Sequence, residues 1–418
     1  MTEADDLLAR DSAAFFHQHG STPSLGALRA AQGLWLEDAD GRRFIDLHGN
    51  TVHHLGHGNP EIVAALKAQL DELAFAPRRY TNLPAVALAE ALRARWPGPP
   101  ARVLFATGGS DAIEIAIKLA RVATGRSETV SLEGAYHGHG FGAFGLSSAA
   151  PDPRLGAFLP GRHHVTPYWA GEDGPAQMLE EIARHLATGR IAAVIAEPMR
   201  ANCHVPPADL WPQVRALCDA QGTKLIFDEI PSGLGKTGRF FAFEHFGAVP
   251  DLAVLGKALG GGMVPLAAVI GDARLDVAPE LELGHYTHEK NPLTTRAALT
   301  ALEIIARDGL VARAAAAGQT LREGIATIAT RVPCVTGIRG LGLLQAVEFA
   351  PDRAGHPPGP AFAERLVACA FAEGLSTTAK DDASLGLSLP LTVTDAEIAE
   401  VLARIEAMAG RLGRGPLS

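Results

Sequence analysis

Apolar and polar residues alternate along residues 33–46, on both sides of an Asp-Gly pair. Alternation with a period of two is typical of a half-buried strand, and Asp-Gly is a strong turn signal, so this stretch predicts a β-hairpin. In residues 60–73 the apolar positions recur at helical spacing after a proline suited to a first turn, which predicts a helix. A second long helical pattern covers residues 294–306.

Between these two helices, short apolar runs are separated by helical patterns. Runs of this length predict buried strands, and strands that alternate with helices predict βαβ units and a mostly parallel sheet. A further strand-rich region at residues 337–349 precedes terminal helices. We expect an α/β chain with an N-terminal segment (1–60), a large domain (61–310) and a C-terminal small domain (311–418). The predicted buried strands are residues 103–105, 129–131, 192–196, 224–227 and 252–255.

The composition narrows the class of protein. A chain of 418 residues that is 47% hydrophobic can bury a large core, and its net charge of -9 is spread without long runs. No basic footprint of a nucleic-acid binder is visible, so a small-molecule partner is expected. The apolar stretches are too short for a membrane span and the N-terminus lacks a signal sequence, which predicts a cytoplasmic protein. The four cysteines are widely separated and predict buried, reduced thiols rather than disulfides or a zinc site.

The residues that follow two of the predicted strands carry candidate chemistry. Asp228 and Glu229 come directly after one strand, and Lys257 comes after another, beside a run of three glycines. Each feature alone is more often a helix cap, a solvated turn or a surface lysine. Together they provide a carboxylate for a pyridinium nitrogen and a strand-end amine for a Schiff base, at the sheet edge where ligands bind. Pyridoxal 5′-phosphate (PLP) chemistry needs this pair.

These stretches resemble the signature of the class III aminotransferase family, and the resemblance covers nearly the whole chain. It implies the PLP-dependent transferase fold of type I, with a large, mostly parallel sheet flanked by helices and a smaller α+β lobe built from both termini. It also implies that Lys257 forms the internal aldimine and that catalysis passes through an external aldimine and a quinonoid. The catalytic residues implied are Lys257 and Asp228, and the cofactor contacts implied are Gly109, Ser110, Tyr136, His137, Glu197, Asp228, Ile230, Lys257 and Thr287.

The roles follow the family's pattern. Asp228 would pair with the ring nitrogen, Ile230 would pack on one ring face, and the aromatic ring of the Tyr136 motif would stack on the other. Gly109 and Ser110 would hold the phosphate at a helix N-terminus, a natural anion site. Thr287 would reach the phosphate of the neighbouring subunit, which implies a homodimer with the active site at its interface.

Two competing motifs lack the required context. Residues 233–238 resemble part of a P-loop, but a full P-loop needs a glycine where Ile230 stands. The Gly108-Gly109 pair lacks the spacing of a dinucleotide-binding site. His137, taken alone, is more often a packed histidine, and only its Tyr-His-Gly context favours a cofactor contact.

One departure from the family concerns the substrate. Gly386 aligns with a position where ornithine-type members carry an arginine for a carboxylate, so a keto-acid acceptor would lack its bidentate partner. The candidates for binding substrate are Arg78, Arg79, Arg200, His53 and His54, each of which could equally be structural.

The sequence leaves the subclass open. The segments at residues 17–23, 50–58, 76–82 and 285–292 are also similar to a lyase branch of the family, the (R)-1-hydroxy-2-aminoethylphosphonate ammonia-lyases. This resemblance implies that a β-hydroxy amine loses ammonia and yields phosphonoacetaldehyde. The alternative is an ω-aminotransferase that passes the amino group to a keto acid such as pyruvate. A binding module that has lost catalysis is disfavoured, because both Asp228 and Lys257 are present.

Overall fold

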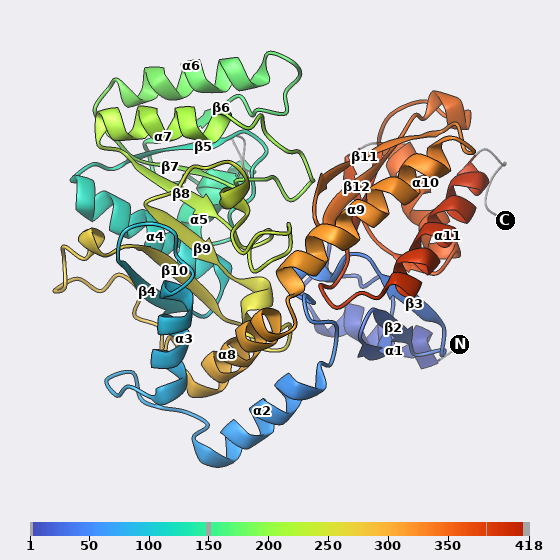
Figure 1. The fold of residues 1–418 in the computed structure, drawn as a ribbon, viewed down its shortest axis with the longest axis horizontal. Helices are drawn as coiled ribbons and strands as arrows, with labels where there is room; N and C mark the ends of the chain where they lie inside the picture. The colour runs from blue at the N-terminus through green and yellow to red at the C-terminus, as the bar shows by residue number, and fades with distance from the viewer. Residues whose placement is uncertain (1–2, 148–151, 382, 413–418) are drawn as a thin grey trace.

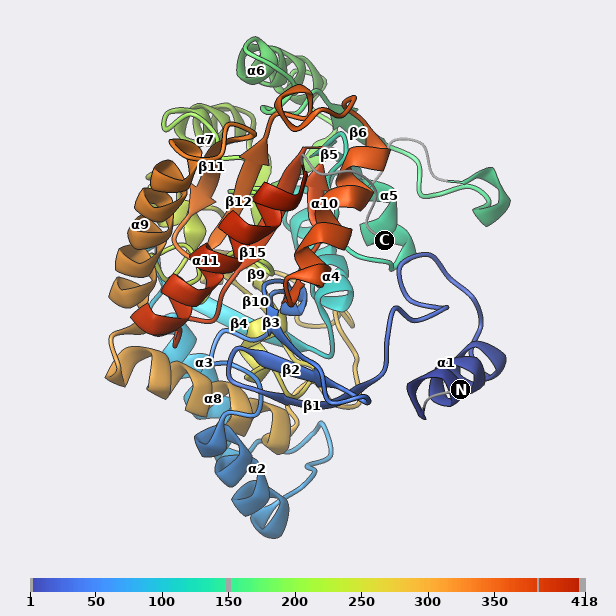
Figure 2. The same cartoon turned by 90° about the vertical axis from the view of Figure 1, so that its right-hand side faces the viewer.

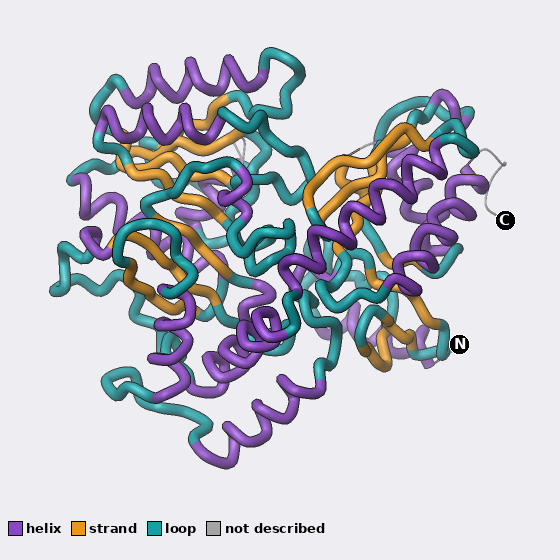
Figure 3. Tube along the Cα trace, in the orientation of Figure 1, coloured by secondary structure: helices purple, strands orange, loops and turns teal. Residues whose placement is uncertain are grey.

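The structure, a computed structural model, describes residues 3–147, 152–381 and 383–412. Its strands gather in two regions, each flanked by helices (Figure 3). The first region is a seven-stranded sheet in the order β4-β10-β9-β8-β7-β5-β6. Its strands are β4 (Ala101–Ala106), β5 (Glu128–Leu132), β6 (Arg162–Val165), β7 (Ile191–Ala196), β8 (Lys224–Asp228), β9 (Leu252–Leu255) and β10 (Ala267–Asp272).

The large sheet is mostly parallel, as predicted. Strands β6, β5, β7, β8 and β9 pair in parallel, and only β10 runs antiparallel to both of its neighbours. Its helices are α2 (Pro60–Glu72), α3 (Leu83–Arg93), α4 (Gly109–Thr124), α5 (Phe141–Ser147), α6 (Gly174–Leu186), α7 (Leu210–Gln221) and α8 (Pro292–Arg307).

Helices cover both faces of this sheet, with α6 and α7 above it in Figure 1 and α4 against its other side. The alternating side chains of β7 show how the sheet packs against helices on both faces. Val194 and Ala196 join the apolar cluster that contains residues of α6 and α7, whereas Ala193 and Ile195 join a second cluster built on α4. Because successive strand residues point to opposite faces, a strand buried on both faces is apolar throughout, as β7 is.

The smaller lobe combines the two ends of the chain. The predicted hairpin forms as β2 (Trp35–Asp38) and β3 (Arg43–Asp46), and β1 (Leu28–Gln32) and β13 (Leu375–Ser376) complete a sheet in which β13 pairs with β3 in parallel. A second sheet has the order β11-β12-β15-β14. Its strands are β11 (Val335–Leu341), β12 (Leu344–Phe349), β14 (Ala379–Asp381) and β15 (Ser384–Ser388).

Three helices pack in this lobe: α9 (Leu310–Ala329), α10 (Pro360–Ala372) and α11 (Asp395–Leu412). Helix α1 (Glu3–Ala14) has no buried residue and stands apart from the rest of the chain in Figure 2. All four cysteines are buried and free, in agreement with the sequence. Among the described residues, no helix is both long and apolar enough to cross a membrane.

Candidate active site

Asp228 and Lys257 lie side by side at one edge of the large sheet. Strands β8 and β9 are parallel neighbours with Asp228 opposite Val254, and Lys257 stands two residues beyond the end of β9. Lys257 begins a short 3₁₀ turn, Lys257–Gly260, and has a φ of 49°. A left-handed backbone costs a non-glycine residue about 1–3 kcal/mol and is concentrated at functional positions.

Burial also acts on the charge of Lys257. Desolvation is the largest cause and lowers the pKa of the ammonium, although the carboxylates of Asp228 and Glu197 oppose this shift. A lysine with a lowered pKa has more of its amine in the neutral, nucleophilic form at physiological pH.

A cavity of about 390 Å³ opens between these groups. It contains eight of the nine cofactor contacts predicted from sequence, and Thr287 is the exception. Sequence reasoning did not single out Ala201 or Pro231, which carry no polar side chain that could have marked them. The lining residues are Gly109, Ser110, Tyr136, His137, Gly138, Glu197, Arg200, Ala201, Asp228, Ile230, Pro231 and Lys257.

Asp228 is held from two sides. Its Oδ2 lies 2.8 Å from Nδ1 of His137, and its Oδ1 accepts a hydrogen bond of 3.1 Å from the backbone N–H of Ile230. Both side chains of the Asp228–His137 pair are buried. The Nε2 of His137 is also buried and has no hydrogen-bond partner within the described chain. His137 therefore fixes the direction of the carboxylate.

The other end of the cavity is the N-terminus of α4. Its N-cap is Gly108, which provides no side-chain hydrogen bond, so the first backbone N–H groups of the helix point into the site. Ser110 Oγ accepts a hydrogen bond of 3.0 Å from the backbone N–H of His139. Gly138 has a φ of +123°, and a Cβ there would lie 2.9 Å from Cα of Ser110. The loop thus approaches the helix terminus as closely as a glycine permits.

Glu197 and Arg200 form an ion pair in the cavity wall. Arg200 also donates a hydrogen bond of 2.7 Å from Nη2 to the backbone oxygen of Gly134. Glu197 accepts from the backbone N–H of Ala201 at 3.1 Å. Both charged groups therefore have partners within the chain, although Nε of Arg200 is buried without one among the described residues.

Comparison with known proteins identifies the family that shares this site. The model of the class III aminotransferases matches residues 16–409. The chain belongs to the class III aminotransferase family. Members of this family depend on PLP, and the cavity fits that cofactor, because a half-buried lysine, a buried carboxylate and an open helix N-terminus face one space.

Relatives within the class III family differ in reaction. One is the (R)-1-hydroxy-2-aminoethylphosphonate ammonia-lyase of Vibrio splendidus, which is 35% identical over 96% of this chain and 89% of its own length. Another is the diaminobutyrate–2-oxoglutarate aminotransferase of Rhizobium meliloti, 36% identical over 93% and 88%. Among solved structures, an (S)-enantioselective omega-transaminase from Thermomicrobium roseum has a TM-score of 0.88 at 28% identity, over 99% of both chains. Family membership therefore leaves the reaction open.

Of the substrate candidates, Arg200 alone lines the cavity of this class III enzyme. Arg79 and Thr287 are exposed outside it. Arg78 borders a larger cavity of about 610 Å³ together with His285 and Glu289. That larger cavity contains neither Lys257 nor Asp228, so its size does not make it the active site.

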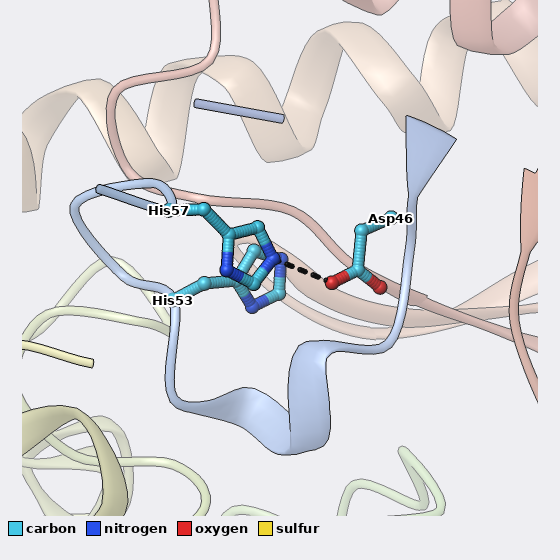
Figure 4. Close-up of side chains that lie close together, drawn as sticks. All are labelled: Asp46, His53 and His57. Carbon is cyan, nitrogen blue, oxygen red and sulfur yellow. Dashed lines mark hydrogen bonds and ion pairs between the residues drawn. The ribbon is translucent and has the colours of Figure 1, made fainter. Parts of the chain in front are cut away.

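His53 and His54 are buried and do not line the cavity. The Nε2 of His54 lies 3.2 Å from the backbone oxygen of Gly233. His53 stacks on His57 with ring centroids 5.1 Å apart, and His57 bonds to Asp46 through Nε2 and Oδ2 at 2.8 Å (Figure 4). These contacts favour the packing role over the substrate role for both candidates.

The same cluster has the chemistry of a metal site, since ligand atoms of Asp46, His53 and His57 lie within 4.8 Å of one another. Two features oppose a cation there. Asp46 already bonds to His57 and accepts the backbone N–H groups of His48 and Gly49 at 3.0 and 2.8 Å. The charge of the buried Lys236 also acts on His53, whose pKa is lowered to about 3, chiefly by burial. A buried ammonium repels a metal ion.

Proposed function

We propose that this chain is a PLP-dependent ammonia-lyase that acts on a small β-hydroxy amine such as (R)-1-hydroxy-2-aminoethylphosphonate. The observation that carries the proposal is that no arginine of the described cavity wall is free to bind the carboxylate of a keto acid. Position 386 is glycine, and Arg200 of the cavity wall is already engaged by Glu197 and Gly134. An aminotransferase must bind a keto-acid carboxylate in its second half-reaction, and arginine is the usual bidentate partner. The similarity to the Vibrio splendidus lyase supports the same choice.

Under this proposal the cavity residues divide the tasks of binding the cofactor. Lys257 would hold PLP covalently through Nζ, and Asp228 would keep the ring nitrogen protonated. The N–H groups at the start of α4, with Ser110, would bind the phosphate. Ile230 would pack on one face of the ring and the Tyr136–His137 segment would cover the other. The bound cofactor supplies an electron sink for the carbon that carries the substrate amine.

Lys257 would also move the proton. Once the substrate amine has replaced it, its neutral amine is free to take the proton from the amine-bearing carbon. Loss of the hydroxyl from the neighbouring carbon completes the removal of water. The enamine that results takes up water and releases ammonia and phosphonoacetaldehyde, so the net reaction is loss of ammonia.

The alternative is an ω-aminotransferase, favoured by the omega-transaminase folds that resemble this one. It would need a keto-acid site supplied by another arginine. In a homodimer, the exposed segments that contain Arg79 and Thr287 would complete the cavity of the other subunit.

The two reactions separate in one assay. Purified holoenzyme is given (R)-1-hydroxy-2-aminoethylphosphonate without any keto acid, and ammonia is measured together with the cofactor's absorbance. Many turnovers of ammonia with an unchanged PLP spectrum are expected. Conversion to the pyridoxamine form, reversed by pyruvate, would instead establish an aminotransferase. The variant Lys257→Ala should bind PLP non-covalently and release no ammonia. An active Lys257→Ala enzyme would contradict the role proposed for Lys257.

A further inference from the structure

Gly386 and Lys380 fit together across the edge of the smaller lobe. Lys380 lies in β14 and Gly386 in the adjacent strand β15, where Ala379 pairs with Leu385. The side chain of Lys380 occupies the space above Gly386. A Cβ at position 386 would collide with Cε of Lys380 and lie 3.3 Å from its Nζ. The backbone N–H of Gly386 donates to the oxygen of Thr378 at 2.9 Å, which fixes the two strands.

Lys380 is half-buried, yet no hydrogen bond or ion pair joins its ammonium to any residue that the structure describes. Two described carboxylates of the same sheet are already engaged, because Arg339 binds Asp381 at 2.6 Å and Glu348 at 2.9 Å. A partly desolvated cation without a partner is costly, so such a group marks a place where an anion would be stabilised.

Arg339 also ties this hairpin to the wall of the cofactor cavity. Its Nη2 donates to the backbone oxygen of Asn202 at 3.1 Å and to Oγ of Ser384 at 2.9 Å, in addition to Asp381. Asn202 directly follows Ala201, which lines the cavity. Arg339 therefore holds the hairpin that carries Lys380 against the segment that directly follows the cavity wall.

The charge of Lys380 acts on the reactive lysine. It is one of the causes that lower the pKa of Lys257, after burial, which is the largest. It also contributes to the lowered pKa of His48, again after burial. Because electrostatic effects of this kind fall off with distance, the ammonium of Lys380 lies near both Lys257 and His48.

We propose that Lys380 binds the anionic end of the substrate, and that this end is a tetrahedral oxyanion such as a phosphonate. The inference rests on the proposed active site and adds the group that recognises substrate. An ammonium is a compact charge with three donors that diverge, which suits the oxygens of a tetrahedral anion. A planar carboxylate is matched better by the fork of an arginine.

The test measures anion binding to the holoenzyme rather than turnover. Methylphosphonate and acetate are titrated by calorimetry into wild type, Lys380→Met and the control Lys67→Met, whose lysine is exposed on α2. Loss of a charge-assisted contact should weaken methylphosphonate binding at least tenfold in Lys380→Met, which corresponds to about 1.4 kcal/mol. Lys67→Met should bind as wild type does. The PLP absorbance of each variant shows that the cofactor site is intact.

A second variant tests the geometry. Gly386→Ala should push the Lys380 side chain away and weaken methylphosphonate binding, and the double variant Lys380→Met/Gly386→Ala should bind no more weakly than Lys380→Met. Unchanged methylphosphonate affinity in Lys380→Met, or a loss seen with acetate alone, would overturn the inference. The result is independent of the ammonia assay, so Lys380 can fail while the lyase assignment holds, and the reverse.

Discussion

At the scale of single residues, the pairing of Asp228 with His137 organises the cavity. A carboxylate buried with one histidine and one backbone N–H has little freedom to rotate, so its charge is directed at one place. Its neighbour Glu229 faces the opposite way. Glu229 accepts the backbone N–H groups of Ala242 and Phe243, both at 2.9 Å, and burial raises its pKa to about 7. Adjacent acidic residues thus have separate tasks.

Replacing Asp228 by Asn keeps the shape of the side chain but removes its charge. Because a neutral amide cannot stabilise a protonated ring nitrogen, we expect kcat to fall about 10²–10³-fold, the range found for the loss of one electrostatic contact to a reacting group. Steady-state kinetics at saturating PLP checks this expectation. Asp219→Asn, at an exposed position, is the control. A kcat within threefold of wild type would contradict the role of Asp228.

At the scale of elements, the cavity depends on how closely one loop approaches the start of α4. Gly138 makes this approach, with a left-handed φ and no room for a Cβ beside Ser110. A methyl group there would push Ser110 away from the place where, as proposed above, its backbone and hydroxyl would bind the phosphate of the cofactor. In that proposal the helix terminus and the loop form one anion site together.

Gly138→Ala should weaken PLP binding. The displaced Ser110 would lose a hydrogen bond to the charged phosphate worth about 1–3 kcal/mol, which corresponds to a loss of about 5- to 150-fold in affinity. Fluorescence titration of apoenzyme with PLP measures the dissociation constant. Gly125→Ala carries similar strain at the end of α4 but meets no atom within 4 Å, so its PLP affinity should stay near that of wild type. Equal PLP affinities in the two variants would contradict an anion site formed by the Gly138 loop and the start of α4.

At the scale of the whole molecule, the buried histidines make stability depend on pH. Burial, followed by the charge of Lys236, lowers the pKa of His53 to about 3 from its ordinary 6.5. Between these two values the unfolded chain binds a proton that the folded chain does not. The stability of the folded state is therefore fully present above pH 6.5 and is lost as pH falls toward 3.

For one group with this shift, unfolding free energy should drop by about 2 kcal/mol between pH 7 and pH 5. His53→Asn should remove that part of the drop, although it also lowers stability at pH 7 by opening a gap in the core. Urea unfolding of holoenzyme at both pH values and at one fixed protein concentration measures the difference. His19→Asn, at an exposed position, should follow wild type. A pH dependence unchanged by His53→Asn would contradict the shift.

Much of the fold could be predicted because its signals are local. Strands β7, β8 and β9 are apolar runs bounded by polar residues, and α2 and α8 repeat their apolar positions at helical spacing after a proline. Strand β1 was not predicted, since all five of its residues are exposed and show no alternation. Strand β6, with the sequence Arg-His-His-Val at a sheet edge, likewise lacks an apolar run.

The sequence by itself determined the chemistry of the site, because a lysine and an aspartate that follow neighbouring strands must meet at one sheet edge. Only the tertiary structure decided which other charges reach them. It paired Arg200 with Glu197, buried His53 and His54 away from the cavity lining, and laid Lys380 over Gly386. Some of the deciding contacts join residues far apart in the sequence, such as His54 and Gly233, and one sequence does not record such distances. They depend on how the lobe built from both chain ends packs against the sheet.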